Sequence, residues 1–326
     1  MSSPTLSIIL CTYNRAASLR RTLETLCALQ IPLGLTWELL LVDNNSTDAT
    51  KQVGEEFRSK LPIRYLFEPR QGKSYALNTA VEAAGGDLLL FTDDDVDVDP
   101  NWLAGYQEAA DRHAEVGFFG GRILPRWATP PPPWVVRNLG QLNTIVHLDW
   151  GDAEKLITDP DHAVFPGANV AFRRTTFAGG LHFRQDLCPT GSPDSIWGNV
   201  RGEENILEQG LLRAGQSGLY VPTAIVHHRH PPQRCTEKFL RTYYSAQGIS
   251  LVRRSGTMPC GPYLFGAPRR WWVRLVLQAL RFLKVRWLTS DRVWLEAEIN
   301  MATTWGEIAE VRRLSALSIQ PGMRFP

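Results

Sequence analysis

Cysteines are few and unpaired in this chain of 326 residues. The five are scattered along the sequence, at Cys11, Cys27, Cys188, Cys235 and Cys260. No Cys-x-x-Cys pair occurs among them, so the sequence indicates neither a zinc site nor a disulfide framework. We therefore expect a protein of the reducing cytoplasm.

Long apolar runs, a secretory leader and an excess of charge are also absent. No window of about 18 or more uninterrupted apolar residues occurs, which argues against a membrane-spanning helix. Residues 1–5 do not show a charged segment followed by an apolar one, so we expect no secretory signal. The formal charge is +2, and without a domain-wide excess of base we expect no nucleic-acid partner.

The composition is that of an ordinary globular protein, with 44% hydrophobic and 21% charged residues. The first hundred residues alternate short apolar runs with segments of helical spacing. We predict strands at 6–11, 38–42, 63–67 and 88–92, and helices at 18–29, 47–60 and 74–84. This alternation predicts an α/β fold with a mostly parallel sheet flanked by helices.

Three consecutive carboxylates, Asp93, Asp94 and Asp95, follow the fourth predicted strand. Like charges at this spacing repel, and a divalent cation with oxygen ligands is the simplest means of holding them together. In an extended chain Asp93 and Asp95 point to one side and Asp94 to the other, which predicts an Asp-x-Asp metal grip. Asp99, before Pro100, is instead expected to cap the next helix.

Polar residues also follow the other three strands: Thr12 to Arg15, then Asp43 to Asn45, then Glu68. Open α/β sheets bind ligands at the carboxyl ends of their strands, so these loops predict a site at that edge. No glycine-rich phosphate loop accompanies them. Gly72-Lys73-Ser74 lacks the earlier glycine of a P-loop, and no Gly-x-Gly-x-x-Gly follows the first strand.

Two clusters later in the chain have more than one explanation. Glu203 and Glu204 begin a helical apolar stripe, where the helix dipole alone would favour acids. His227, His228 and His230 follow a predicted strand at 219–226. They have the chemistry of metal ligands, but a zinc site would need further ligands.

The order of these motifs resembles that of the family 2 glycosyltransferases. The resemblance covers roughly residues 5–235 and rests on Thr12-Tyr-Asn-Arg15, Asp43-Asn-Asn-Ser-Thr-Asp48, Gly72-x-x-x-Ala76-x-Asn78 and Thr92-Asp-Asp-Asp95. It implies a GT-A fold, in which a nucleotide-binding half and an acceptor-binding half share one continuous sheet. It also implies an inverting, metal-dependent transfer of a sugar from a nucleotide diphosphate donor, usually a UDP-sugar, to a hydroxyl acceptor.

The resemblance implies roles for matching positions. Thr12, Tyr13 and Arg15 would line the nucleotide pocket. Asp43 would bind the base, and Asp93 would contact the ribose. Asn78 is the last residue of the third motif, Gly72-x-x-x-Ala76-x-Asn78, and would also belong to the donor site. Asp95 would bind Mn²⁺ or Mg²⁺, with Asp94 an alternative contact to metal or ribose. Many members carry arginine where this chain has Leu77, so Lys73 or Arg70 would supply positive charge near the phosphates.

The same resemblance addresses the later clusters. Asn169 would help to shape the donor-sugar and acceptor pocket, and Glu204 matches the acid that acts as general base, with Glu203 as the alternative. His228, or else His227, would lie near the metal or diphosphate, and His230 is expected to be solvated. Separately from the resemblance, four consecutive prolines, Pro130 to Pro133, favour a stiff extended segment. We expect residues 125–160 to form an irregular surface excursion near the acceptor site, with a proline-rich ligand for a partner protein as the rival interpretation.

From residue 233 onward the pattern is helical, so we predict a catalytic domain at 1–232 and a helical C-terminal region at 233–326. Residues 269–288 contain six basic residues and no acid. We expect a basic face formed by Arg270, Arg274, Gln278 and Arg281. A basic, tryptophan-rich amphipathic helix is typical of an anionic membrane surface, and a packed helix with snorkelling basic chains is the equal alternative.

The sequence thus predicts a cytoplasmic glycosyltransferase, peripheral at the inner face of the plasma membrane. Its acceptor would belong to cell-surface glycan or lipid-linked saccharide synthesis. A nucleotidyltransferase is one rival, although it would carry a glycine-rich basic loop after the first strand. A catalytically silent glycosyltransferase-like binding or scaffold protein is another, and the joint presence of Asp93, Asp95 and Glu204 argues against it.

Overall fold

A computed structural model describes residues 5–142, 144–161, 165–187, 196–200, 202–288, 291–317 and 321–325. Cys188, Arg201 and part of the loop before it lie outside these residues. The chain forms two compact units. The first comprises Met1–Ala128, Ile145–Gln185 and Glu203–His230, and the second comprises Thr129–Thr144, Asp186–Gly202 and Pro231–Pro326. The domain boundary at residue 232 stays a prediction.

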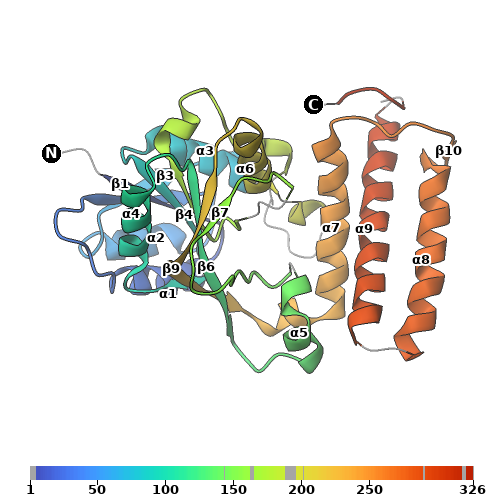
Figure 1. Cartoon of the computed structure of the whole chain (residues 1–326), viewed down its shortest axis with the longest axis horizontal. Helices are drawn as coiled ribbons and strands as arrows, with labels where there is room; N and C mark the ends of the chain where they lie inside the picture. The colour runs from blue at the N-terminus through green and yellow to red at the C-terminus, as the bar shows by residue number, and fades with distance from the viewer. Residues whose placement is uncertain are drawn as a thin grey trace. The chain divides into compact units, whose positions relative to one another are not determined.

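The first unit is built on one sheet (Figure 1). Its strands are β1 (Leu6–Thr12), β2 (Trp37–Asp43), β3 (Ile63–Phe67), β4 (Leu88–Asp93), β5 (Val96–Val98), β6 (Phe118–Trp127), β7 (Lys155–Ile157), β8 (Asn169–Arg173) and β9 (Gly218–His230). They lie in the order β3-β2-β1-β4-β8-β6-β9-β5, and β7 also pairs with β9. The first four strands are parallel, and β8, β5 and β7 add antiparallel pairs.

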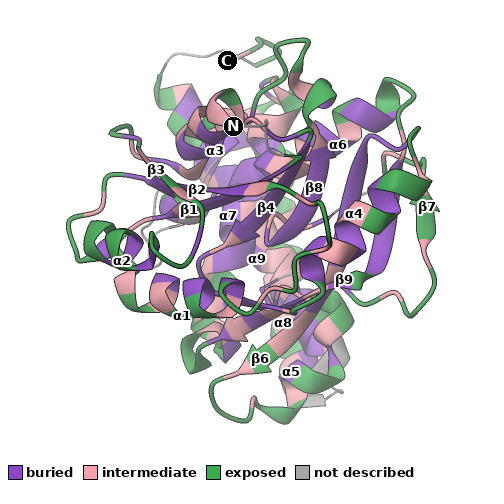
Figure 2. Ribbon diagram, turned by 90° about the vertical axis from the view of Figure 1, so that its left-hand side faces the viewer, coloured by how far each residue is buried: buried purple, intermediate pink, exposed green. Residues whose placement is uncertain are grey.

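Five helices accompany this sheet: α1 (Ala16–Leu26), α2 (Thr50–Phe57), α3 (Lys73–Ala83), α4 (Trp102–Arg112) and α6 (Glu203–Arg213). Each buries the side of the helix on which apolar residues recur, as Leu19, Leu23 and Leu26 do in α1. The apolar runs of β1 and β4 are buried along their length, and Figure 2 shows the middle of the sheet in the colour of buried residues. The predicted strands and helices of the first hundred residues are confirmed, with ends that differ by up to three residues.

The register of the parallel strands aligns their polar ends. Thr12 of β1 pairs with Asp43 of β2, and Cys11 pairs with Asp93 of β4. Asp43 in turn pairs with Phe67, directly before Glu68. The loops that follow these strands therefore begin at one edge of the sheet, as their positions in the sequence predict.

The chain does not stay extended after β4. Asp94 and Asp95 form a turn, and β5 then pairs antiparallel with the end of β9. The chain therefore turns at Asp94 and Asp95 instead of remaining extended as expected, because it must leave β4 to reach β9, but Asp93 and Asp95 still lie in one group. The expected helix start at Pro100 is also early. Helix α4 begins at Trp102, and the Asp99 carboxylate accepts a hydrogen bond from the Asn101 amide in the turn before it.

The segment at 125–160 is more regular than expected. Strand β6 continues to Trp127 because it pairs in parallel with β9 as far as His230. A short helix, α5 (Pro133–Arg137), follows the prolines, and β7 then pairs with the start of β9. The three histidines predicted to follow β9 lie within it, since this strand runs on to His230.

Three long helices dominate the second unit, α7 (Glu237–Ser255), α8 (Arg269–Leu288) and α9 (Asp291–Ala316), with a hairpin of β10 (Tyr263–Leu264) and β11 (Ala267–Pro268). Helix α9 packs against both α7 and α8 (Figure 1). Gly248 of α7 and Gly306 of α9 allow close approach, because a Cβ at either position would collide with backbone of the facing helix. The predicted helical C-terminal region is confirmed. Among the described helices, none has the length and apolar character needed to span a membrane.

Candidate active site

The acidic turn after β4 is held by residues of the loop after β1. Thr12 Oγ1 donates a 2.7 Å hydrogen bond to Asp94, and Arg15 Nη1 lies 2.6 Å from Asp94 and 3.2 Å from Asp95. Burial raises the pKa of Asp94 to about 6, although Arg15 and Thr12 both oppose the rise and Asp95 adds to it. Arg15 thus contacts both Asp94 and Asp95, whereas the Thr12 hydroxyl bonds to Asp94.

Asp93, Asp95 and His228 form a group with the geometry of a metal site. One ligand atom from each lies within 4.8 Å of the other two, and His228 Nε2 is 3.3 Å from Asp95 Oδ1. Two carboxylate oxygens and one imidazole nitrogen suit a divalent ion such as Mn²⁺ or Mg²⁺. The donor set therefore fits the ion that the sequence predicts, and it selects His228 over His227.

His230 is buried, contrary to the expectation that it is solvated. Its side chain is 1% exposed, and its ring stacks on that of His228 with centroids 4.5 Å apart. Trp127, its neighbour across the β6–β9 pair, packs on it at 5.3 Å between centroids. The reason is that β9 continues through this segment, so alternate residues point inward. His227 alternates to the other side and is half-buried.

Arg229 supports the acidic turn and was not identified from the sequence. Its guanidinium forms an ion pair with the buried Asp97 and donates to the carbonyl oxygens of Asp94 and Val96. It also donates 2.9 Å hydrogen bonds to Thr22 Oγ1 and the Ser18 carbonyl of α1. A single partly buried cation thus ties β5, β9 and α1 around the turn. The one feature of the sequence that could have pointed to Arg229 is its position between His228 and His230.

Lys73 joins the carboxylate edge of the sheet to α6. Its ammonium lies 2.8 Å from Asp93 Oδ1 and 3.4 Å from Glu204 Oε1. Burial alone would lower the pKa of Lys73, but Asp93, Glu204 and Glu203 raise it, and the net pKa is well above the ordinary value. Lys73 therefore carries its positive charge between two acids that stand 111 positions apart in the sequence (204 minus 93).

The two acids at the start of α6 have different surroundings. Glu204 retains some exposure, with 13% of its side chain accessible, and its carboxylate lies against Gly167, where a Cβ would collide with it. Glu203 is only 2% exposed. Glu204 therefore lies beside Lys73 with part of its side chain accessible, whereas Glu203 is buried.

Asp43 ends β2 and Asn44 follows it, and their side chains order the loops after β2 and β3. Asp43 accepts hydrogen bonds from the Ser46 amide at 2.8 Å and from the Tyr65 hydroxyl at 2.6 Å. Asn44, whose role was not predicted, donates to the Arg70 carbonyl and accepts from the Gly72 amide, both in the loop before Lys73. Gly72 has a φ of 137°, a conformation that side chains rarely allow. Asn44 thus sets the course of the chain into α3.

Lys73 and Arg70 are the two basic residues expected near the phosphates of the donor. Of these two, Lys73 contacts the acids Asp93 and Glu204. Arg70 lies outside this group, since its guanidinium makes two 2.8 Å hydrogen bonds to Glu68 and stacks on Tyr75. The Arg70 hydrogen bonds hold the pKa of Glu68 at about 2 against the opposing effect of burial, with a further bond from Thr79. Tyr13, expected at the nucleotide, is half-buried beside Thr12.

Asn169 and Asn78, which were predicted to belong to the sugar-donor site, use their side-chain amides for hydrogen bonds within the protein. Asn169 is fully buried: its nitrogen donates to the carbonyls of Arg122 and Ala224, and its oxygen accepts from Trp102 and Tyr106. Both donors and both acceptor positions of this amide are thereby occupied. Asn78 similarly exchanges two hydrogen bonds with the backbone of residue 183. Both asparagines shape the site through the elements they join rather than through free polar atoms.

Comparison with known proteins places this geometry in context. Residues 7–179 match the family model described as Glycosyl transferase family 2. The chain is 30% identical over 258 residues to the succinoglycan biosynthesis protein ExoM of Rhizobium meliloti, covering 74% of this chain and 73% of that protein. It is 25% identical over 257 residues to chondroitin synthase of Escherichia coli, covering 71% of this chain but only 36% of the relative. For glycosyltransferase AglE of Haloferax volcanii the identity is 33% over 102 residues, 31% of this chain and 33% of AglE.

Two solved structures share the fold. The mannosyltransferase PcManGT of Pyrobaculum calidifontis matches with a TM-score of 0.54 and 18% identity, over 99% of this chain and 77% of that one. TarS residues 1–349 of S. aureus match with a TM-score of 0.54 and 16% identity, over 95% and 92% of the two chains. At these identities the likeness concerns the fold alone, and the predicted GT-A fold is confirmed.

Proposed function

The chain belongs to glycosyl transferase family 2, and we propose that this glycosyltransferase moves one sugar from a nucleotide diphosphate to a hydroxyl acceptor with inversion. The single observation that carries the proposal is the position of Lys73, in contact with both Asp93 and Glu204. It brings an acid from α6 to the edge where the metal group lies. A proton acceptor and a binding group for diphosphate are the two parts that a single displacement requires.

The donor side is formed by Thr12, Tyr13, Arg15 and Asp43, at the ends of β1 and β2. We assign a UDP-sugar, in keeping with the family resemblance of these loops, with Asp43 binding the base. The PcManGT structure is described as a complex with GDP-Man and Mn²⁺, and a TarS structure as a complex with UDP. These complexes support a nucleotide diphosphate as the class of donor. A comparison of UDP- and GDP-sugars is therefore part of the test below.

Asp93, Asp95 and His228 would hold Mn²⁺ or Mg²⁺. When bound, the ion would stabilise the negative charge that gathers on the leaving diphosphate. The positive charge of Lys73 at Asp93 would act in the same direction, because its pKa keeps it protonated. The partly buried Arg229 keeps the turn in place so that Asp95 and His228 remain close.

Glu204 would act as the general base. Its carboxylate takes the proton of the acceptor hydroxyl, the hydroxyl oxygen forms a bond to the anomeric carbon, and the bond between that carbon and the diphosphate oxygen breaks. The electron pair of that bond leaves with the diphosphate. Glu203 would support the start of α6 instead, as an acid at the positive end of a helix.

The acceptor would be a saccharide, free or linked to lipid, in the synthesis of a cell-surface glycan. The similarity to a succinoglycan biosynthesis protein over most of this chain supports a polysaccharide pathway. A lipid-linked acceptor would place the enzyme in the cytoplasm, at the inner face of the plasma membrane. Membership of the family sets the nucleotidyltransferase alternative aside, and turnover of a donor distinguishes an enzyme from a silent scaffold.

Thermal unfolding with a panel of UDP-, GDP- and dTDP-sugars, each with Mn²⁺ or with chelator, tests the donor without an acceptor. A true donor at about 100 times its dissociation constant adds roughly 2.7 kcal/mol to the free energy of unfolding. We expect this gain for a UDP-sugar and its loss in chelator. Equal melting with all donors, together with no transfer to any saccharide acceptor, would contradict the proposal.

A further inference from the structure

Helix α8 presents an apolar stripe to solvent. Its members are each between 51% and 61% exposed, and they are Val273, Val276, Leu277, Leu280 and Leu283. The spacing of three and four residues places them on a single side of the helix. Exposed aliphatic residues are common singly, but five along one helix face form a surface that water solvates poorly.

The opposite side of α8 packs within the second unit. Trp271, Trp272 and Leu275 lie against the core formed with α9, and Arg274 forms an ion pair with Glu307 of that helix. The expected basic face is therefore wrong in part, because Arg274 and Gln278 are half-buried toward the packed side. One side of the helix therefore packs, as the packed-helix alternative expects, and the other side is apolar and exposed to solvent.

Exposed cations border the apolar stripe at both ends. Arg269 and Arg270 stand at the start of α8, and Arg281 and Lys284 near its end, all exposed. Arg281 has Glu296 at 3.5 Å, in a pair that is more than half exposed on both sides and therefore weak. Helix α8 itself contains no acid, so the charge around the stripe is positive.

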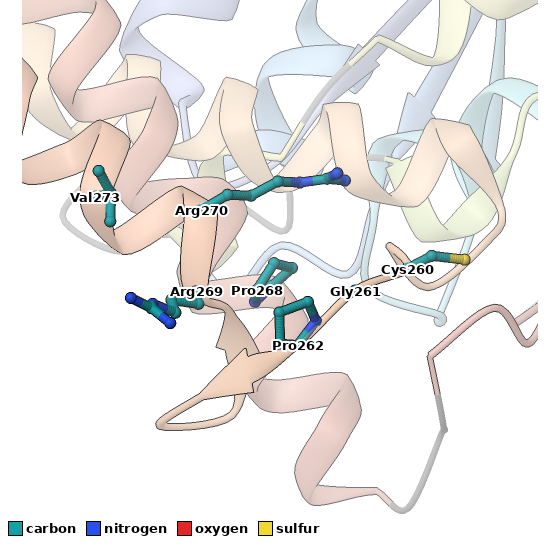
Figure 3. A pocket seen from close by; sticks show the side chains of 7 residues that line it. All are labelled: Cys260, Gly261, Pro262, Pro268, Arg269, Arg270 and Val273. Carbon is teal, nitrogen blue, oxygen red and sulfur yellow. The ribbon is translucent and has the colours of Figure 1, made fainter.

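A recess continues the stripe at the start of the helix. It has a volume of about 320 Å³, and its lining residues include Cys260, Pro262, Pro268 and Val273 together with Arg269 and Arg270 (Figure 3). Val273 belongs to both the recess and the stripe. Apolar walls beside two guanidinium groups match a molecule that has an acyl part and an anionic part.

We propose that this face of α8 lies on the surface of an anionic lipid bilayer. The apolar stripe would enter the boundary between headgroups and acyl chains, and the four cations would contact lipid phosphates. A second copy of this chain fits less well, since pairing two such faces would bring like charges together. The inference goes beyond the proposed transfer and does not depend on its chemistry.

Co-sedimentation of the full chain with vesicles tests this surface. Vesicles of phosphatidylcholine are compared with vesicles in which a third of the lipid is phosphatidylglycerol, each at low and high salt. We expect binding to the anionic vesicles that weakens with salt. In the double variant Leu277→Ser with Leu280→Ser, affinity should fall at least about tenfold, because two large apolar side chains no longer leave water. Arg270→Gln with Lys284→Gln should lower the preference for anionic vesicles by about tenfold.

The matched control is Leu251→Ser with Leu317→Ser, two exposed leucines of the same unit outside α8. It should bind as the native chain does, and circular dichroism checks that each variant folds. Absence of binding to anionic vesicles at low salt would overturn the proposal, as would an equal loss in the control. Light scattering tests whether a second copy of the chain covers this face instead. If the native chain is a dimer that does not bind vesicles, and the Leu277→Ser with Leu280→Ser variant is a monomer, the face belongs to a dimer interface and the proposal is overturned.

Discussion

The ammonium of Lys73 and the carboxylate of Glu204 lie 3.4 Å apart, although 131 residues separate them in the sequence. Lys73 is the first residue of α3, and Glu204 is the second residue of α6. The contact joins the start of α3 to the helix that carries the proposed base. Substitutions that disturb either partner should therefore affect transfer more than folding.

Replacing Glu204 by Gln should reduce transfer by about 10²- to 10⁴-fold, the usual contribution of a general base. Affinity for donor and metal should stay near the native value, because a base acting on the acceptor hydroxyl does not hold the donor. Glu203→Gln is the matched control and should cost much less. Rates and donor affinities measured on both variants decide the assignment: an inactive Glu203→Gln beside an active Glu204→Gln would move the base one residue earlier.

Gly167→Ala should displace the Glu204 carboxylate without unfolding the protein. The added Cβ would overlap that carboxylate. The backbone of Gly167 does not have a positive φ, so alanine can adopt its conformation. We expect transfer to fall by about tenfold or more, since catalytic geometry is sensitive to shifts of about 1 Å. Gly179→Ala, where a Cβ would meet no atom within 4 Å, serves as control. Equal rates for the two variants would show that Glu204 does not act from its present position.

Asp95→Asn should weaken Mn²⁺ binding and abolish transfer while leaving the protein folded. Asparagine removes a charged oxygen ligand from the group formed with Asp93 and His228. Bound Mn²⁺ is measured by electron paramagnetic resonance, which requires no donor or acceptor. The exposed Asp111→Asn is the control. Native Mn²⁺ affinity in Asp95→Asn, or full activity of that variant in chelator, would exclude this carboxylate as a ligand.

Arg229→Met should lower the free energy of unfolding by about 3–5 kcal/mol, because it leaves the buried carboxylate of Asp97 without its main cation. Arg126→Met is a close control: Arg126 also pairs with Asp97, but its side chain is 52% exposed. Loss of such a surface partner should cost at most about 1 kcal/mol. Urea unfolding measures both. Similar losses would mean that Arg229 does not hold the acidic turn as its contacts indicate.

Glu68 should make stability depend on pH on the acid side. Its pKa is about 2 in the folded protein against 4.5 for the free side chain, chiefly through Arg70. Its stabilisation is therefore complete above pH about 4.5 and is lost as pH falls through about 2. Glu68→Gln should reduce the free energy of unfolding by about 1.5–3 kcal/mol at pH 6, and the difference should shrink toward pH 3. The exposed Glu108→Gln should show no such convergence in urea titrations.

Local patterns in the sequence determined the first half of the fold and the chemical identity of the site. Continuous apolar runs such as Leu88 to Phe91 predict buried strands, and alternation with helices predicts parallel neighbours. Parallel strands bring their carboxyl ends to one edge, so the proximity of Thr12, Asp43 and Asp93 follows from their positions in the chain. The acids themselves indicate a cation, because like charges require one.

Only the tertiary structure decided which neighbour in each cluster faces the site. Successive residues on a helix differ by about 100° in direction, so the rotation of α6 gives Glu204, beside Lys73 and Gly167, surroundings that differ from those of the more buried Glu203. Successive residues on a strand alternate, so the pairing of β9 with β5 and β6 turns His228 and His230 inward and leaves Arg229 to hold the acidic turn. The packing of α8 on α9 likewise decided that the outward side of that helix is apolar. These outcomes depend on contacts between segments far apart in sequence, which no local pattern records.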